Sequence, residues 1–155
     1  MKFTSVKMIN GDQHYQICQQ ELKKHKWKDF DYGSLGEQDV RYAILNENNE
    51  LIGFYQLIEY QENYEKQASC ELYKLFIFPE YRGQGYGSLI VKELMQYIYL
   101  EYNEFYIEIL DETKEFWDKA LRNFICANYT TTLSNRVQNG IRYIFSKKAK
   151  VPLLD

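Results

Sequence analysis

The residues best suited to chemistry form a glycine-rich turn between an apolar strand and a helix. The turn reads Arg82-Gly83-Gln84-Gly85-Tyr86-Gly87-Ser88 and follows the apolar run 71–78, which ends at Pro79. Glycine lets a backbone approach a phosphate closely, and the unpaired N–H groups in the first turn of a helix attract anions. The spacing therefore predicts a site for a phosphate-bearing ligand.

Two common nucleotide-binding patterns do not fit this turn. The triphosphate loop GxxxxGK[ST] needs a lysine, and none follows Gly87. The dinucleotide fingerprint GxGxxG opens a βαβ unit, whereas these glycines alternate with other residues in mid-chain. A different phosphate-bearing ligand is therefore expected.

The segment around the turn resembles the signature of the GCN5-related N-acetyltransferase family. Its Q/R-x-x-G-x-G/A pattern is met by residues 82–87, and residues 75–87 are similar to its longer L-x-V-x-P-x-Y-R-G-x-G-x-G. Residues 51–54, Leu-Ile-Gly-Phe, resemble its third strand. The resemblance implies an α+β fold with a mixed, mostly antiparallel sheet flanked by helices, whose strands four and five splay around the cofactor.

The resemblance also implies acetyl-CoA as cosubstrate. Backbone N–H groups of residues 84–88 would hold its pyrophosphate. Main-chain groups of Leu75 and Ile77 would meet the thioester carbonyl and the pantetheine arm, where a backbone donor stabilises developing negative charge. The cofactor-binding residues expected in this way are Leu75, Phe76, Ile77, Arg82, Gly83, Gln84, Gly85, Tyr86, Gly87 and Ser88.

Acetyl transfer to an amine calls for a base, because a primary amine is mostly protonated at neutral pH. Glu71 stands eleven residues before Arg82. Histone-acetyltransferase-like members of the family carry a glutamate base at that offset, so the resemblance makes Glu71 the candidate general base. Glu59, near the end of the preceding strand, is the second candidate.

The helix expected at 113–124 departs from the family pattern. Many members carry there a tyrosine that protonates the leaving thiolate, but the corresponding residue is Trp117. Solvent could protonate the thiolate instead, and Tyr129 is a candidate substitute. This departure supports an alternative function, a catalytically silent acyl-CoA-binding or sensory module.

Periodicity predicts the elements that must position these residues. Asn10, with Gln13 three residues on, predicts a helix start of the capping-box type and a helix ending near His25. Residues 29–39 are expected to form a loop or short helix, 46–50 a hairpin turn, and 61–67 a polar connection. The predicted strands are 3–9, 40–45, 51–58, 71–78, 105–110, 129–133 and 141–145, and the later helices are 88–99 and 113–124.

Composition limits the classes of function. A length of 155 residues with 45% hydrophobic residues predicts one domain, 1–155. A net charge of −3 argues against nucleic acid as a partner. Three widely spaced cysteines without a CxxC pair predict neither a disulfide framework nor a metal site. No apolar signal core or membrane-length apolar run occurs, so a soluble, cytoplasmic protein is expected.

The partners expected are acetyl-CoA and an amine acceptor, with a homodimer as a possible assembly. Direct attack by the amine in a ternary complex is favoured, because no nucleophile stands out. The acceptor would be chosen by the first helix region and the loops at 29–39 and 60–68, which carry several carboxylates. This part of the chain is made acidic by Glu37, Asp39, Glu59, Glu62 and Glu65. Their charge favours a small cationic amine, or a lysine or N-terminal amine.

Overall fold

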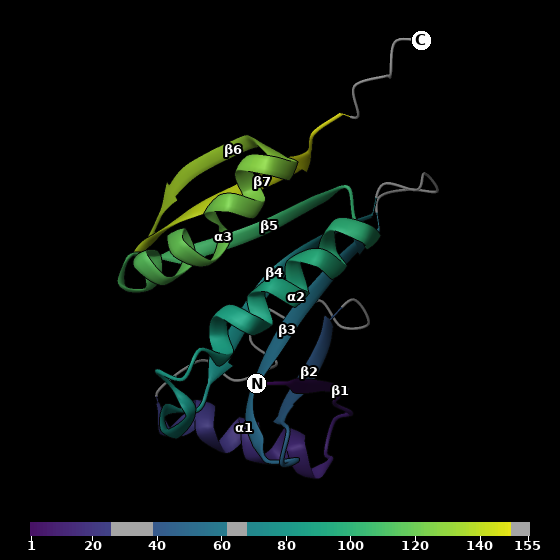
Figure 1. Ribbon diagram of the computed structural model, residues 1–155, viewed down its shortest axis with the longest axis vertical. Coiled ribbons are helices and arrows are strands. Elements are labelled where there is room, and N and C mark those ends of the chain that lie inside the picture. Colours follow the sequence, from purple (N-terminus) through teal and green to yellow (C-terminus); the bar gives the residue numbers. More distant parts are fainter. Residues whose placement is uncertain (26–38, 62–67, 150–155) are drawn as a thin grey trace. The chain divides into compact units, whose positions relative to one another are not determined.

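A computed structural model describes residues 1–25, 39–61 and 68–149 (Figure 1). The chain forms two compact units. The first comprises residues 1–60 and 70–90, and the second comprises residues 61–69 and 91–155. The predictions for the loop at 29–38 and for most of the connection at 61–67 lie outside the described residues.

The first unit is built on four strands and one helix. Its elements are β1 (Phe3–Lys7), α1 (Gln13–Lys24), β2 (Asp39–Asn46), β3 (Leu51–Gln61), β4 (Ala68–Ile77) and the short η2 (Pro79–Tyr81). The strands lie in the order β1-β2-β3-β4, and β2 pairs antiparallel with both β1 and β3. The helix α2 (Tyr86–Glu101) begins here and continues into the second unit.

The core of the first unit lies between α1 and one face of the strands. The apolar stripe predicted for α1 is confirmed, since Cys18 and Leu22 are fully buried. They pack with Phe54 of β3 and Phe76 of β4 in one hydrophobic cluster. Burying a leucine or phenylalanine side chain contributes about 1.5–3 kcal/mol, so this seam fixes α1 on the strands (Figure 1).

The predicted cap of α1 is wrong. The N-cap is Asp12, whose Oδ1 accepts a hydrogen bond from the Tyr15 N–H at 2.7 Å, while its Oδ2 accepts from the Ile9 N–H at 2.9 Å. These backbone donors lower the pKa of the Asp12 carboxyl. Asn10 instead accepts a hydrogen bond from Arg41. Both side chains are good caps, and a partner distant in sequence decides between them.

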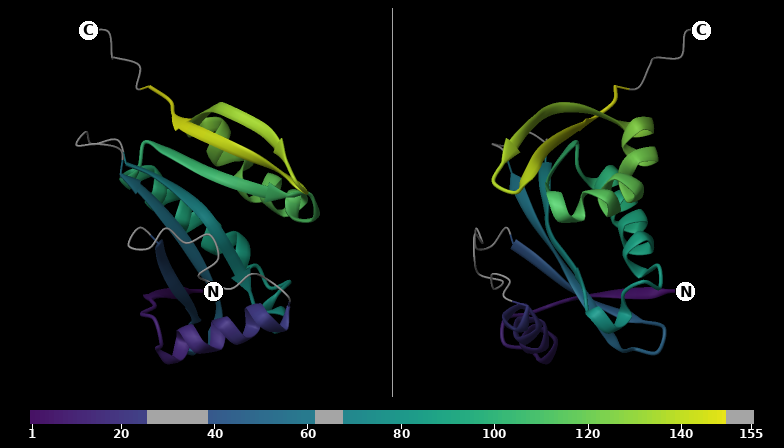
Figure 2. Two further views of the ribbon diagram at one scale, coloured as in Figure 1. Left: turned by 180° about the vertical axis from the view of Figure 1, so that it is seen from behind. Right: turned by 90° about the vertical axis from the view of Figure 1, so that its left-hand side faces the viewer.

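The second unit contains β5 (Glu104–Leu110), η3 (Asp111–Thr113), α3 (Lys114–Asn128), β6 (Tyr129–Val137) and β7 (Gly140–Lys147). The strand β7 lies between β5 and β6 and pairs antiparallel with both. Figure 2 shows the β6–β7 hairpin, and α3 contacts β5 and β6. Phe105 lies in its core, with its ring centroid 5.0 Å from those of Tyr129 and Phe145.

Most predicted elements are confirmed, with shifted ends. The strand β4 begins at Ala68, and α2 begins at Tyr86 rather than at residue 88, so Gly87 and Ser88 belong to the first helical turn. Both hairpin turns contain an asparagine in the left-handed region, Asn49 at φ 60° and Asn139 at φ 62°. The α+β class is confirmed. The splay of strands four and five and the single domain 1–155 stay predictions.

The three cysteines differ in exposure. Cys18 and Cys70 are buried, whereas Cys126 on α3 is exposed. Burial raises the pKa of the Cys18 thiol to about 12 and also raises that of Cys70. Neither thiol is therefore available as a thiolate nucleophile at neutral pH.

Substitution of Gly53 by alanine tests the close approach of β3 and β4. A Cβ at Gly53 would lie 2.2 Å from the Phe76 carbonyl oxygen and 3.0 Å from the Ile77 Cα, both backbone atoms that cannot rotate away. We expect Gly53→Ala to lower the free energy of unfolding by about 2 kcal/mol, measured by denaturant unfolding.

Gly11→Ala is the matched control. No atom lies within 4 Å of a Cβ at Gly11, and φ is +86°. This variant should lose only the cost of left-handed strain, about 1 kcal/mol. A Gly53→Ala protein as stable as the wild type would show that the two strands separate easily.

Candidate active site

The glycine-rich turn follows directly from the end of β4. Pro79 opens η2, and the Tyr81 and Arg82 N–H groups donate to the carbonyls of Phe78 and Pro79 at 2.9 and 3.2 Å. Gly83 at φ 75° and Gly85 at φ 94° then adopt left-handed conformations. Glycine is needed at these two positions, because other residues are strained there.

The first turn of α2 presents backbone donors beside these glycines. The first helical hydrogen bond runs from the Leu89 N–H to the Gly85 carbonyl at 3.2 Å. The N–H groups of residues 86–88 therefore have no acceptor within the helix. The Tyr86 side chain is buried, which anchors the helix start, whereas Ser88 is exposed. The structure thus gathers the predicted residues 84–88 into one anion-attracting turn.

Arg82 braces the turn against β4. Its Nε donates to the Ile77 carbonyl at 2.7 Å, and its guanidinium carbon lies 5.0 Å from the centroid of the Phe76 ring. The hydrogen bond joins the residue before the first left-handed glycine to the end of the strand. The cofactor-binding role of Arg82 stays a prediction, and in the structure its side chain fixes the turn.

A second brace, missed in the sequence, comes from Tyr81. Its hydroxyl donates to Glu50 Oε2 at 2.9 Å, and this hydrogen bond raises the pKa of the tyrosine. Glu50 lies at the β2–β3 turn, where its N–H donates to Asn46 Oδ1 at 2.9 Å. The turn before α2 is thereby joined to a neighbouring hairpin. Tyr81 belongs to the stretch that resembles the family signature, which marked it as noteworthy, but the sequence did not indicate Glu50 as its partner.

Along β4, the N–H and C=O groups of successive residues point alternately toward the two edges of the strand. The Phe78 N–H donates to the Ile52 carbonyl of β3 at 2.8 Å, so main-chain groups of Leu75 and Ile77 face the edge away from β3. These are the two residues expected to meet the thioester and arm. The Phe76 side chain, by contrast, is 2% exposed and lies in the core cluster.

Glu71 is a buried carboxylate near the start of β4. It is 7% exposed, and its Oε2 accepts a hydrogen bond from the Tyr60 hydroxyl of β3 at 2.9 Å. Burial raises the pKa of the neighbouring Cys70 thiol most, and the negative charges of Glu59 and Glu71 raise it further. Both carboxylates therefore lie near Cys70. The structure thus brings both candidate bases to the same end of the β3–β4 pair.

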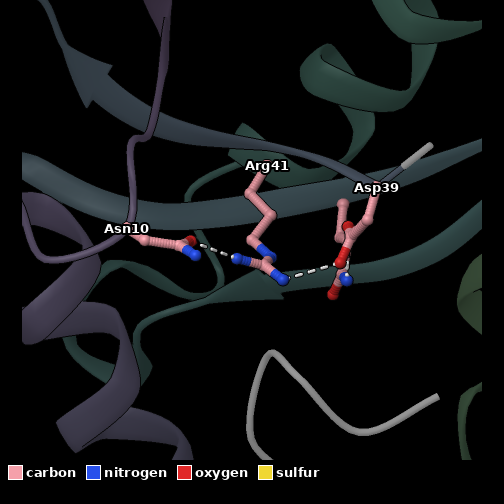
Figure 3. A network of polar contacts seen from close by, with 4 residues as sticks. Asn10, Asp39 and Arg41 are labelled. Atoms are coloured by element: carbon pink, nitrogen blue, oxygen red, sulfur yellow. Dashed lines mark hydrogen bonds and ion pairs between the residues drawn. The ribbon is translucent and has the colours of Figure 1, made fainter. Parts of the chain in front are cut away.

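A buried polar network lies beside these strands (Figure 3). Arg41 Nη1 donates to Asn10 Oδ1 at 2.8 Å, and its Nη2 donates to Asp39 Oδ2 at 2.7 Å. Gln56 Nε2 donates to the other carboxylate oxygen of Asp39 at 2.7 Å. The Asp39 side chain is 1% exposed. Its charge is therefore paired inside the protein and adds nothing to an acidic acceptor surface; Glu37, Glu62 and Glu65 lie outside the described residues.

The two candidate acid positions belong to the second unit. Trp117 on α3 is half-buried, with its ring centroid 5.1 Å from that of Phe116. Tyr129 is 3% exposed and packs against Phe105, Tyr99 and Phe124. Trp117 has no proton that a thiolate could take at neutral pH, and the Tyr129 ring is part of an aromatic core.

The described residues hold neither a metal-ligand cluster nor a membrane-spanning helix. Within residues 1–25, 39–61 and 68–149, no three histidine, cysteine, aspartate or glutamate side chains are grouped so as to hold a metal ion. Over the same part of the chain, no helix combines the length and the apolar character needed to cross a membrane.

Solved structures share this fold. A chimera of the spermidine N-acetyltransferase SpeG from Vibrio cholerae and hSSAT is 14% identical, with a TM-score of 0.61 over 95% of this chain and 96% of that chain. Arabidopsis thaliana NAA60 in complex with acetyl-CoA is 12% identical, with a TM-score of 0.59 over 93% and 97%. The NatC complex bound to Gag peptide and CoA gives 11% identity and a TM-score of 0.61 over 97% and 100%.

The sequence itself was compared with families and with curated proteins. No curated protein matches it. A model of the acetyltransferase (GNAT) family matches residues 7–124, which include the strand β4, the glycine-rich turn and all of α2. This match spans most of the chain, and the protein therefore belongs to the acetyltransferase (GNAT) family and is an acyltransferase.

Proposed function

We propose that the protein transfers an acetyl group from acetyl-CoA to an amine, by direct attack of the amine in a ternary complex. The observation that carries this proposal is the turn before α2, where Gly83 and Gly85 are left-handed and the N–H groups of residues 86–88 have no acceptor within the helix. The family match includes residues of both units, so we take 1–155 as one catalytic domain.

The turn and β4 would hold the cosubstrate between them. Backbone N–H groups of residues 84–88 meet the pyrophosphate, since the glycines leave room for it and the helix dipole favours its charge. The pantetheine arm would run beside β4, where main-chain groups of Leu75 and Ile77 meet the arm and the thioester carbonyl, and a backbone donor stabilises the charge that develops on the thioester oxygen.

Glu71 would accept the proton of the attacking amine, directly or through a water molecule. Its burial in the first unit keeps the carboxylate away from bulk solvent, and it lies on β4, the strand proposed to make the acyl contacts. The leaving thiolate would be protonated by solvent, because Trp117 stands at the usual tyrosine position and Tyr129 is buried in an aromatic cluster.

The acceptor is proposed to be a small cationic amine, or the amine of a lysine or of a protein N-terminus. The solved structures of similar fold include a spermidine N-acetyltransferase and a complex bound to a peptide, which represent both kinds. A panel of spermidine, a lysine-containing peptide and a peptide with a free N-terminus would separate them by release of free CoA.

One observation favours a second function. Trp117 cannot serve as a general acid, so the chain could bind acyl-CoA without turning it over, as a sensory module. In that case acetyl-CoA stabilises the protein, but no amine of the panel releases CoA.

Cosubstrate binding is tested by thermal unfolding. Acetyl-CoA at about 100 times its Kd should stabilise the native state by about 2.7 kcal/mol. Gly85→Asp should abolish this stabilisation, because it places bulk and negative charge at the pyrophosphate position. Gly85→Ala carries the same left-handed strain without the charge and should weaken binding less. An unchanged melting temperature of the wild type at millimolar CoA would overturn the proposal.

Trp117→Phe tests whether α3 supplies the acid. Phenylalanine keeps much of the packing against Phe116, so most of kcat should remain, while KM for acetyl-CoA can rise. A fall in kcat of about 10²-fold, the usual contribution of a general acid, with cosubstrate binding intact, would assign Trp117 a direct role in catalysis.

Glu71→Gln tests the base. Glutamine keeps the shape and one acceptor oxygen but takes no proton, so kcat should fall about 10²-fold while acetyl-CoA affinity stays near wild type. The deficit should shrink as pH rises, because more of the amine is already neutral. Glu59→Gln is the comparison, since a deficit confined to that variant would move the base to Glu59. A deficit of Glu71→Gln that is equal at every pH would indicate a structural role instead.

A further inference from the structure

The candidate base accepts a hydrogen bond from Tyr60, a residue for which the sequence predicted no role. Tyr60 of β3 donates its hydroxyl proton to Glu71 Oε2 across the strand pair, at 2.9 Å. The carboxylate is 7% exposed, and a buried carboxylate needs hydrogen-bond donors to offset its lost hydration. A hydrogen bond to a charged acceptor is among the stronger ones in proteins.

Side-chain alternation along β3 distinguishes Tyr60 from Glu59, the second candidate base. Side chains alternate along β3, so Tyr60 lies on the face that carries Phe54 and Gln56, and Glu59 lies on the opposite face. Phe54 packs with Cys18 and Leu22 of α1. The Tyr60 hydroxyl reaches Glu71 on the neighbouring strand, whereas Glu59 lies on the opposite face of β3 from Tyr60.

The bond restricts the conformation of the carboxylate. A glutamate side chain has three rotatable bonds, and ordering it costs conformational entropy. A donor fixed on a neighbouring strand holds one oxygen and so sets the plane of the carboxylate and the direction of Oε1. Proton transfer depends on that direction, because the base must lie within hydrogen-bond reach of the amine.

We infer that Tyr60 is a positioning residue for acetyl transfer, which holds Glu71 Oε2 so that Oε1 meets the proton of the amine. The inference rests on the proposed function, with Glu71 as base. Oε1 takes a proton from the ammonium form of the amine, and the neutral nitrogen then bonds to the acyl carbon. The C–S bond breaks, and the CoA thiolate gains through solvent the proton that the nitrogen then sheds, while the Tyr60 hydroxyl keeps its own proton throughout. Tyr60 therefore acts through Glu71 and touches neither substrate.

A double-mutant cycle tests the inference with the best acceptor among spermidine, a lysine-containing peptide and a peptide with a free N-terminus. Tyr60→Phe removes only the hydroxyl and should lower kcat about tenfold, with KM for acetyl-CoA changed less than about twofold. In the Glu71→Gln background the same change should have almost no further effect, because the residue through which Tyr60 acts is gone.

Tyr106→Phe is the matched control. Tyr106 donates its hydroxyl to Glu104 at 3.4 Å in the second unit, so this variant also loses a tyrosine–glutamate hydrogen bond. It should keep wild-type kcat. Melting temperatures and the stabilisation by acetyl-CoA, measured on all variants, show that each is folded and binds the cosubstrate.

The outcomes separate this inference from the proposed base. If Glu71→Gln lowers kcat and Tyr60→Phe does not, or if the two effects multiply fully, Tyr60 has no positioning role and the base stands. If Glu71→Gln is as active as the wild type, the base and the inference fail together. A crystal structure of Tyr60→Phe gives a test without turnover: the Glu71 carboxylate should leave its wild-type rotamer, and an unchanged rotamer would overturn the inference.

Discussion

The candidate site depends on the close approach of β4 to β3 at Gly53. The absence of a side chain there lets the Phe76 carbonyl come so near that a Cβ would overlap it. Farther along the same pair, the Tyr60 hydroxyl reaches Glu71. At the other end, the Phe78 N–H bonds to Ile52, just before the chain turns toward α2. One strand, placed by its neighbour, thus carries both the candidate base and the approach to the phosphate-binding turn.

The turn is held by side chains that need not touch a ligand. Arg82 ties it back to the Ile77 carbonyl, and Tyr81 ties it to Glu50 of the adjacent hairpin. The left-handed glycines alone would give a backbone with many accessible conformations. The two hydrogen bonds restrict these conformations, which favours an arrangement with the donors of the first turn of α2 in place before an anion arrives. Pre-organisation of this kind lowers the entropic cost of binding.

Local patterns in the sequence predicted most of the fold but only part of the site. Alternation and helical periodicity identified the strands and the stripe of Cys18 and Leu22, because these signals are repeated over many residues. The predicted N-cap of α1 was wrong because Asn10 and Asp12 are both good capping residues close to the helix start. Only the buried Arg41, which donates to Asn10, distinguishes them. The phosphate-binding turn is contiguous and could be recognised. The Tyr60–Glu71 and Tyr81–Glu50 bonds could not, because they depend on strand register rather than on neighbouring residues.

The burial of Cys18 and Cys70 has a practical consequence. Both thiols are shielded and protonated at neutral pH, whereas Cys126 lies exposed on α3. A maleimide reagent, which needs an accessible thiolate, should therefore attach to the native protein at a single position without any mutation. A dye at that position would report on the second compact unit by fluorescence, while the first unit keeps its natural sequence.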